Sequence, residues 1–285
     1  MRLIAASLSA RRRSRLAGPV VLLLGLLLTG GLYVALSPAQ AADQEASTDE
    51  IAAGRALFLV GCASCHGQNG EGIETARGTV YGPSLVGVGA ASVDFQVGTG
   101  RMPMSQPGAQ APKKEPKYTD EQISLLAAYV ASLGPGPAIP TEEQYDPNAI
   151  PESEKEEAIV RGGEFFRTNC TACHNFAGSG GALSQGKYAP SLEGVTPKHI
   201  YEALLTGPQQ MPVFSEANLT SEEKREVIAY IESIQNLPQY GGGSMGALGP
   251  VSEGLFAWLV GIGACVAAGI WIAAHSTRSS KKGAH

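Results

Sequence analysis

The chain has 285 residues, a formal net charge of -5, an ordinary 44% of hydrophobic residues and only 6% of aromatic residues. This composition argues against a disordered polyelectrolyte and against a large enzyme core filled with aromatic side chains. The charge is unevenly distributed: residues 37–250 carry 13 basic and 25 acidic side chains, so we expect no nucleic-acid binding through this acidic part.

The first predicted element is a charge-free apolar run over residues 19–36, inside an N-terminal segment of residues 1–42. Basic residues precede the run, and the small-x-small sequence Ala39-Gln40-Ala41 follows it. This order is typical of a secretory signal peptide, whereas the length of the run also suits an uncleaved membrane anchor. Both interpretations place the residues that follow outside the cytoplasm.

The middle of the chain contains three sequence blocks that recur in the same order, 107 to 109 residues later. The pairs are Cys62-Ala63-Ser64-Cys65-His66 with Cys170-Thr171-Ala172-Cys173-His174, Tyr81-Gly82-Pro83-Ser84-Leu85 with Tyr188-Ala189-Pro190-Ser191-Leu192, and Met102-Pro103 with Met211-Pro212. An internal repeat of this kind indicates two copies of one domain. We predict the copies at residues 47–134 and 153–238.

Each copy is predicted to be helical. Capping-box sequences precede the first and last helices of the copies: Ser47…Glu50, Thr119…Gln122, Ser153…Glu156 and Thr220…Glu223. The first helix of each copy should run directly into the cysteine motif, and the last helix has apolar residues at a helical period. The segments between these helices are rich in Gly and Pro without strand alternation, and we expect loops there.

A Pro-rich linker, residues 135–152, joins the two copies, and a Gly-rich hinge, residues 239–253, follows the second copy. The next segment, residues 254–275, is predicted to be a transmembrane helix, because residues 255–274 contain no charge. The tail, residues 276–285, is basic and should lie in the cytoplasm. The chain would then be single-pass or multi-pass in the cell membrane, with both copies on its extracytoplasmic side.

The repeated Cys-x-x-Cys-His motif is the attachment signature of c-type haem. Two thiols bind the haem vinyl groups, and the adjacent histidine becomes an axial ligand of the iron. The sequence therefore predicts two covalently bound haem c groups. The attachment residues are Cys62, Cys65, Cys170 and Cys173, and the axial histidines are His66 and His174. A large apolar cofactor also fits copies of about 85 residues, which bury little apolar surface unaided.

The second axial ligand of each iron is predicted to be methionine, which is common in cytochromes c. The repeat pairs Met102 with Met211, each followed by proline. Met104 stays open as an alternative to Met102, because it follows a glycine at the same spacing as Met211 does. His199 could ligate the second iron instead, but the first copy has no matching histidine, so we interpret it as a surface or packing residue.

Other readings of the cysteines fit less well. A redox-active Cys-x-x-Cys pair would be expected in a βαβ pattern, which neither copy shows, and it would not need the adjacent histidine. A four-thiolate zinc site would require the two copies to merge, although the repeat indicates that each is self-contained. A two-residue spacing is also too strained for a structural disulfide.

Residues 51–133 and 158–237 each resemble a class I cytochrome c domain. The order of segments resembles the dihaem, c1-type cytochrome c subunits of the actinobacterial cytochrome bcc menaquinol:cytochrome c reductase, which associates with an aa3 oxidase. The resemblance implies an all-α fold, with two tandem cytochrome c domains and a C-terminal transmembrane helix. It also implies that the carbonyls of Pro83 and Pro190 accept hydrogen bonds from the axial histidines.

As implied by the resemblance, the chain relays electrons from a Rieske iron–sulfur subunit and cytochrome b to the terminal aa3 oxidase, with membrane lipid around its anchor. It would count as a subunit of a quinol–cytochrome c reductase, a translocase, with no catalytic residues of its own. Haem propionates could hydrogen-bond Arg77, Tyr81, Arg101 and Tyr188, for which surface roles are equally open.

Three other functions remain as alternatives. A dihaem electron-acceptor subunit of a periplasmic dehydrogenase would usually carry three haem motifs, and this chain has two. A free-standing, c4-like electron carrier would lack the C-terminal spanning helix. A dihaem peroxidase would need one five-coordinate iron, and a test for peroxide turnover would distinguish it.

Overall fold

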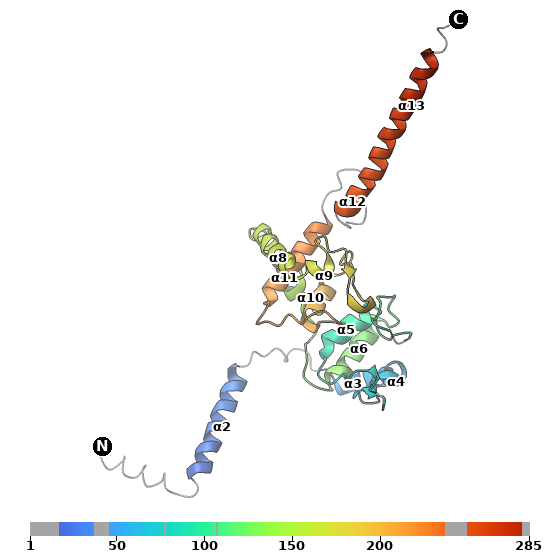
Figure 1. Ribbon diagram of the computed structural model, residues 1–285. Coiled ribbons are helices and arrows are strands. Elements are labelled where there is room, and N and C mark those ends of the chain that lie inside the picture. Colours follow the sequence, from blue (N-terminus) through green and yellow to red (C-terminus); the bar gives the residue numbers. More distant parts are fainter. Residues whose placement is uncertain (1–16, 37–45, 77, 107, 237–249, 281–285) are drawn as a thin grey trace, which may run out of the picture. The chain divides into compact units, whose positions relative to one another are not determined.

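The computed structural model describes residues 17–36, 46–76, 78–106, 108–236 and 250–280. Its contacts divide the chain into two units, up to Ala46 and from Ser47 onward, and each is described by itself. The predicted cleavage site at residues 39–41, Arg77 and most of the Gly-rich hinge lie outside the described residues. Figure 1 shows the helices and strands under the labels used below.

The first unit contributes one described helix, α2 (Ala17–Leu36), which carries no charged residue. Its apolar residues Gly18–Gly31 have described side chains, and all those from Val20 to Leu28 that are large and hydrophobic are exposed. At the other end of the chain, α12 (Pro250–Phe256), the π-helical η3 (Ala257–Ile262) and α13 (Gly263–Ser280) follow one another directly. Residues Ser252–His275 have a mean hydropathy of 2.2. Among the described helices, this is the one stretch that is long and apolar enough to cross a membrane.

The first repeat copy consists of four helices and a short two-stranded antiparallel ladder. The helices are α3 (Thr48–Gly61), α4 (Ala63–His66), α5 (Gly89–Gly98) and α6 (Asp120–Ala131), and β1 (Ile73–Glu74) pairs with β2 (Val80–Gly82). The core lies between α3, α5 and α6, around the buried side chains of Phe58, Val97 and Leu126. The rings of Phe58 and Tyr129 lie 5.1 Å apart and tie α3 to α6.

The second copy repeats this arrangement. Its helices are α8 (Lys155–Asn169), α9 (Thr171–His174), α10 (Pro197–Thr206) and α11 (Ser221–Gln235), and β3 (Gly181–Ala182) pairs with β4 (Tyr188–Ala189), with the 3-10 turn η2 (Ser184–Gly186) between the strands. Phe166 and Tyr230 lie 5.4 Å apart, as Phe58 and Tyr129 do in the first copy. The linker contains α7 (Glu142–Tyr145) and the 3-10 turn η1 (Pro147–Ala149), and its Ile150 packs against the second copy.

The helix crossings depend on a repeated glycine that the sequence analysis did not single out. A Cβ atom on Gly54 would collide with the carbonyl oxygen of Leu125 in α6, and one on Gly162 would collide with that of Glu226 in α11. The two glycines stand 108 residues apart, in the frame of the cysteine motif, which is the signal that could have identified them.

Several predicted elements are confirmed. The described part of the chain is mostly helical, and capping boxes at Ser47, Thr119 and Thr220 begin α3, α6 and α11. The capping box predicted at Ser153…Glu156 is wrong. Helix α8 begins after Glu154, without a side-chain cap, because residues 151–154 form a turn in which the Glu154 amide donates to the Pro151 carbonyl at 2.9 Å.

The expectation of loops between the first and last helices is wrong at α5 and α10. Helix α5 is only ten residues long and begins and ends with glycine. Most of its residues are buried, so its sequence shows little alternation between apolar and polar residues at a helical period. Helix α10 has a Thr196 cap and Pro197 in its first turn, both ordinary start signals. The two small ladders also add strands to a fold that we expected to be all-α.

Candidate haem-binding sites

Each cysteine motif forms one turn of helix directly after a long helix. The amide of His66 donates to the Cys62 carbonyl at 3.0 Å, and the amide of His174 donates to the Cys170 carbonyl at 2.8 Å. Residues three and four positions apart lie on the same face of a helical turn. Both cysteines and the histidine of each motif are therefore presented together.

The first cysteine of each motif is half-buried and the second is exposed. Burial, followed by the neighbouring Cys65, raises the pKa of Cys62 to about 11. Burial and Cys173 raise the pKa of Cys170 to about 11 in the same way. A redox-active Cys-x-x-Cys pair needs a cysteine with a lowered pKa, so these raised values argue against thiol–disulfide exchange.

The two motif histidines are held by the prolines that the resemblance singled out. Nδ1 of His66 lies 2.8 Å from the carbonyl oxygen of Pro83, and Nδ1 of His174 lies 3.0 Å from that of Pro190. A carbonyl only accepts, so each Nδ1 carries the proton and donates it, which leaves the lone pair on Nε2. A ring oriented in this way is typical of a metal-ligating histidine.

The loop after each motif is closed by the same pair of backbone hydrogen bonds. The Gly72 amide donates to the His66 carbonyl at 2.7 Å, and the Gly180 amide donates to the His174 carbonyl at 2.9 Å. Both glycines have a φ near +85°, which a side chain would strain. Leu85 and Leu192 close the second bond of each pair, to Gly70 and Gly178. The sequence repeat is thus a repeat of backbone structure.

The two sites differ where the strand before the proline passes the motif. A Cβ atom on Gly82 would collide with the carbonyl oxygen of Cys65 and come within 3.1 Å of Nδ1 of His66. The second copy has Ala189 at this position. There the glycine stands on the opposite strand instead, because Ala189 pairs with Gly181, whereas Gly82 pairs with Ile73. Each ladder therefore keeps one glycine next to the motif turn.

Methionines lie where the repeat predicts them. Met102 follows α5 and packs against the core of the first copy, as Cys62 does. Met211 follows α10 and packs against the core of the second copy, as Cys170 does. Met104 is not among the described side chains that pack against the first core. This packing favours Met102 over Met104 as the candidate ligand.

Large apolar side chains remain exposed in the segments that flank both motifs. They include Val60, Val80, Tyr81 and Val86 in the first copy, and Phe176 and Tyr188 in the second. Val60, directly before the first motif, is 91% exposed. Exposed apolar surface beside paired thiols and a histidine with a free Nε2 fits a flat, apolar, covalently attached haem.

The remaining candidates lie where the two copies meet. The guanidinium of Arg101 lies over the ring of Phe95, 4.8 Å from its centroid. The His199 ring packs edge-on against the same Phe95 ring, with 6.1 Å between the centroids. Tyr188 is bound through its backbone, since its amide donates to Gln110 at 2.9 Å and its carbonyl accepts from Gln110 at 2.7 Å.

A second glutamine makes the reciprocal contact at this junction. The Gln209 side chain accepts from the Ala111 amide at 3.3 Å and donates to the Ala111 carbonyl at 3.1 Å. Each glutamine therefore pairs with the backbone of the other copy through two hydrogen bonds. The sequence analysis missed both residues, because a single glutamine carries no signal for the surface that it contacts.

Two repeated motif turns, each with an oriented histidine and a core-packed methionine, define a c-type cytochrome with two cytochrome c domains. Family comparisons agree. The cytochrome c family matches residues 51–134, and the family described as cytochrome C oxidase, cbb3-type, subunit III matches residues 157–231.

Similar proteins extend the match to nearly the whole chain. The cytochrome bc1 complex cytochrome c subunit of Corynebacterium efficiens is 44% identical, covering 93% of this chain and 90% of that protein. The subunit of the same name from Mycobacterium tuberculosis is 43% identical, covering 93% of each chain. That from Corynebacterium diphtheriae is 44% identical, covering 94% of this chain and 97% of its own. The chain belongs to this family of cytochrome c subunits.

Proposed function

We propose that this chain is a membrane-anchored dihaem cytochrome c that relays electrons from a quinol-oxidising complex to a terminal oxidase. The observation that carries the proposal is the duplicated motif turn, in which a proline carbonyl holds each histidine with Nε2 free. Two such sites in one chain would let an electron pass from one haem to the other, as a relay requires.

The residues divide into two ligand sets. Cys62 and Cys65 would attach the first haem, with His66 and Met102 as axial ligands. Cys170 and Cys173 would attach the second haem, with His174 and Met211 as axial ligands. When bound, each haem accepts and releases a single electron at its iron.

The protein would contribute attachment and orientation of each haem. The hydrogen bond from Nδ1 to the proline carbonyl fixes the orientation of each ring. It also makes Nε2 a stronger electron-pair donor to a metal. Thioether links keep the cofactor in place outside the cytoplasm. With a histidine and a methionine on each iron, no position would remain open for a substrate, so we infer that this chain has no bond-making step and no catalytic residue of its own.

The C-terminal helix supports the anchored location. Ile270 is 66% exposed and Leu259 is 57% exposed, and both lie within the apolar stretch Ser252–His275. Such a surface suits a lipid environment. We infer that the basic tail lies in the cytoplasm and both haem domains lie outside it. The N-terminal segment acts either as a cleaved signal or as a second anchor.

The relatives are named as subunits of the cytochrome bc1 complex. From this name we infer a cytochrome b and a Rieske iron–sulfur subunit as partners that supply electrons, which makes the chain part of a quinol–cytochrome c reductase, a translocase. We further infer that an aa3 oxidase receives the electrons. The domain limits proposed from the repeat, residues 47–134 and 153–238, place one haem in each domain.

Purification from membranes in mild detergent tests the proposal. We expect two haems per chain in a pyridine haemochrome assay, and cytochrome b and Rieske subunits among the co-purifying proteins. One haem per chain, or none, would refute the dihaem assignment. A dehydrogenase as the co-purifying partner would instead favour the electron-acceptor alternative, and isolation of the chain alone would favour the free carrier.

A further inference from the structure

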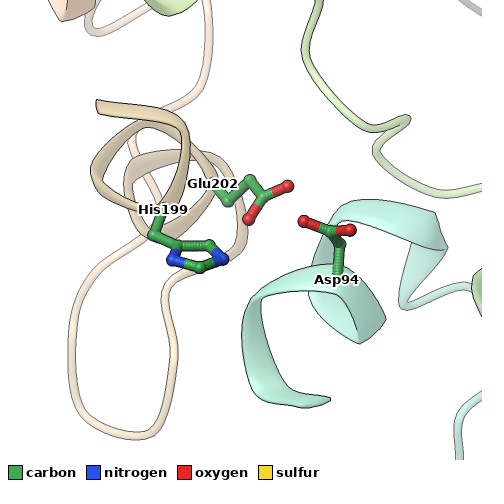
Figure 2. A group of neighbouring side chains, drawn as sticks. All are labelled: Asp94, His199 and Glu202. Carbon is green, nitrogen blue, oxygen red and sulfur yellow. The ribbon is translucent and has the colours of Figure 1, made fainter. Parts of the chain in front are cut away.

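Three potential metal ligands, none of them part of a cysteine motif, converge at the junction of the two haem domains. Asp94 lies on α5 of the first domain, and His199 and Glu202 lie one turn apart on α10 of the second (Figure 2). One ligand atom from each side chain lies within 4.8 Å of the other two. Figure 2 shows the two carboxyl groups facing each other and one ring nitrogen of His199 pointing toward them.

Glu202 is buried without a hydrogen-bond donor. Its exposed fraction is 0%, and neither carboxylate oxygen has a hydrogen-bond partner in the part of the chain that the structure describes. Removing a carboxylate from water without replacing its hydrogen bonds is costly. Burial, then the side-chain hydrogen bond that a protonated Glu202 makes with Asp94 and the charge of Asp94, raise the pKa of Glu202 to about 10, so without a cation the two carboxyl groups share a proton. A cation between the two carboxyl groups would remove this cost.

The lysine at the junction does not fill this role. Lys198 pairs with Oδ2 of Asp94 at 2.7 Å, and it is partly exposed. Its ammonium group offsets the charge of Asp94 and leaves Glu202 without an equivalent partner. When both carboxyl groups are ionised, they and the one ammonium group leave one negative charge, which favours a further positive ion at this position.

His199 offers a neutral nitrogen to such an ion. Burial lowers the pKa of His199, although the charge of Asp94 raises it. The nearby cations Lys198, Lys113 and Arg101 lower it further. A lowered pKa favours the unprotonated ring, which has a free lone pair. Its edge-on packing against Phe95 restrains the ring next to the carboxyl groups.

We propose that Asp94, His199 and Glu202 bind a zinc ion that joins the two haem domains. One imidazole and two carboxylates form a ligand set that zinc accepts, and a water molecule completes four-coordination. Zinc bonds of about 2.0–2.2 Å require the three ligand atoms to move closer together, which side-chain rotation provides. Because one ligand comes from the first domain and two from the second, the ion fixes the junction without taking part in electron transfer.

The test uses the full-length, haem-containing chain purified in mild detergent within its complex. After treatment with a chelator, the protein is dialysed against zinc sulfate, and bound zinc is counted by mass spectrometry of the metals. We expect the wild type to hold one zinc per chain more than His199→Ala and Glu202→Gln. The matched controls are His275→Ala and Glu193→Gln, which alter exposed residues of the same types and should retain the wild-type count.

A second measurement guards against variants that fail to fold. The haem content and absorption spectrum report folding of each variant, and Asp94→Asn replaces Glu202→Gln if the latter loses haem. Zinc should raise the thermal midpoint of the wild type by several degrees and leave that of His199→Ala unchanged. Equal zinc counts in wild type and folded His199→Ala would overturn the proposal. So would the absence of bound zinc, since a shared proton would then satisfy the carboxyl pair.

Discussion

The two haem domains of this chain share a backbone frame but differ in the segments that follow it. The motif turns, the histidine–proline hydrogen bonds and the loop-closing glycines match pair by pair. The stretch from the methionine to the last helix is longer in the first domain, from Met102 to Asp120, than in the second, from Met211 to Ser221. The duplicated parts carry the proposed haem sites, and the longer stretch of the first domain contributes Gln110 and Ala111 to the junction.

The largest predicted effect comes from substitutions that destabilise one domain and leave the other folded. Gly54→Val and Gly162→Val each place a side chain against a helix backbone, and we expect a loss of at least about 3 kcal/mol in the domain concerned. The pyridine haemochrome assay should then report one haem per chain in place of two. Ala53→Val, at an exposed position of α3, should keep both haems. A normal haem count in Gly54→Val would contradict the close packing of α3 and α6.

A second prediction compares the methionines. Met102→Leu and Met211→Leu should each remove the sulfur–iron absorption band of one haem. Each should also lower one reduction potential, by a sizeable part of the roughly 0.8 V range that axial ligands span. Met104→Leu should change neither, since its side chain is not among those packed against the first core. Potentiometric titration followed by absorption measures both properties. A lowered potential in Met104→Leu, with Met102→Leu unaffected, would transfer the ligand role to Met104.

A third prediction uses the exchange of glycine between the two ladders. Gly82→Ala should destabilise the first domain by about 1–3 kcal/mol, because the new Cβ atom meets the Cys65 carbonyl. Ala189→Gly should cost the second domain about 0.5–1 kcal/mol, through chain flexibility alone. Thermal unfolding followed at the haem absorption compares the two. Equal losses would mean that the strand next to the motif turn is no closer in the first domain than in the second.

The smallest predicted effect concerns the first helices, since α3 has a capping box and α8 does not. Hydrogen bonds from the amide and side chain of Ser47 lower the pKa of Glu50. A carboxylate with a lowered pKa stabilises the folded state above its ordinary pKa, and this contribution is lost as the pH falls through the lowered value. Glu50→Gln should therefore reduce the thermal midpoint at pH 7 slightly and reduce its acid dependence. Glu156→Gln should leave the thermal midpoint and its acid dependence unchanged. An equal effect of Glu156→Gln would indicate that α8 does have a capping box.

The sequence alone predicts the repeat, the motif residues, three of the four capping boxes and the C-terminal apolar helix, because each follows from local pattern. It does not predict α5, whose burial comes from packing against α6 and α10 (Figure 1). It also misses the junction. A glutamate such as Glu202, on an amphipathic helix, is expected to face water, and only the approach of Asp94 from the other domain shows that it does not.

The reciprocal pairing of Gln110 with Tyr188 and of Gln209 with Ala111 has a further consequence. Tyr188 lies on the strand that leads to the proline behind the second histidine, and Gln209 lies two residues before Met211. The segments that lead to Pro190 and to Met211 are thus both hydrogen-bonded to the first domain. A change at this junction should therefore alter the positions of both proposed axial ligands of the second haem, His174 and Met211.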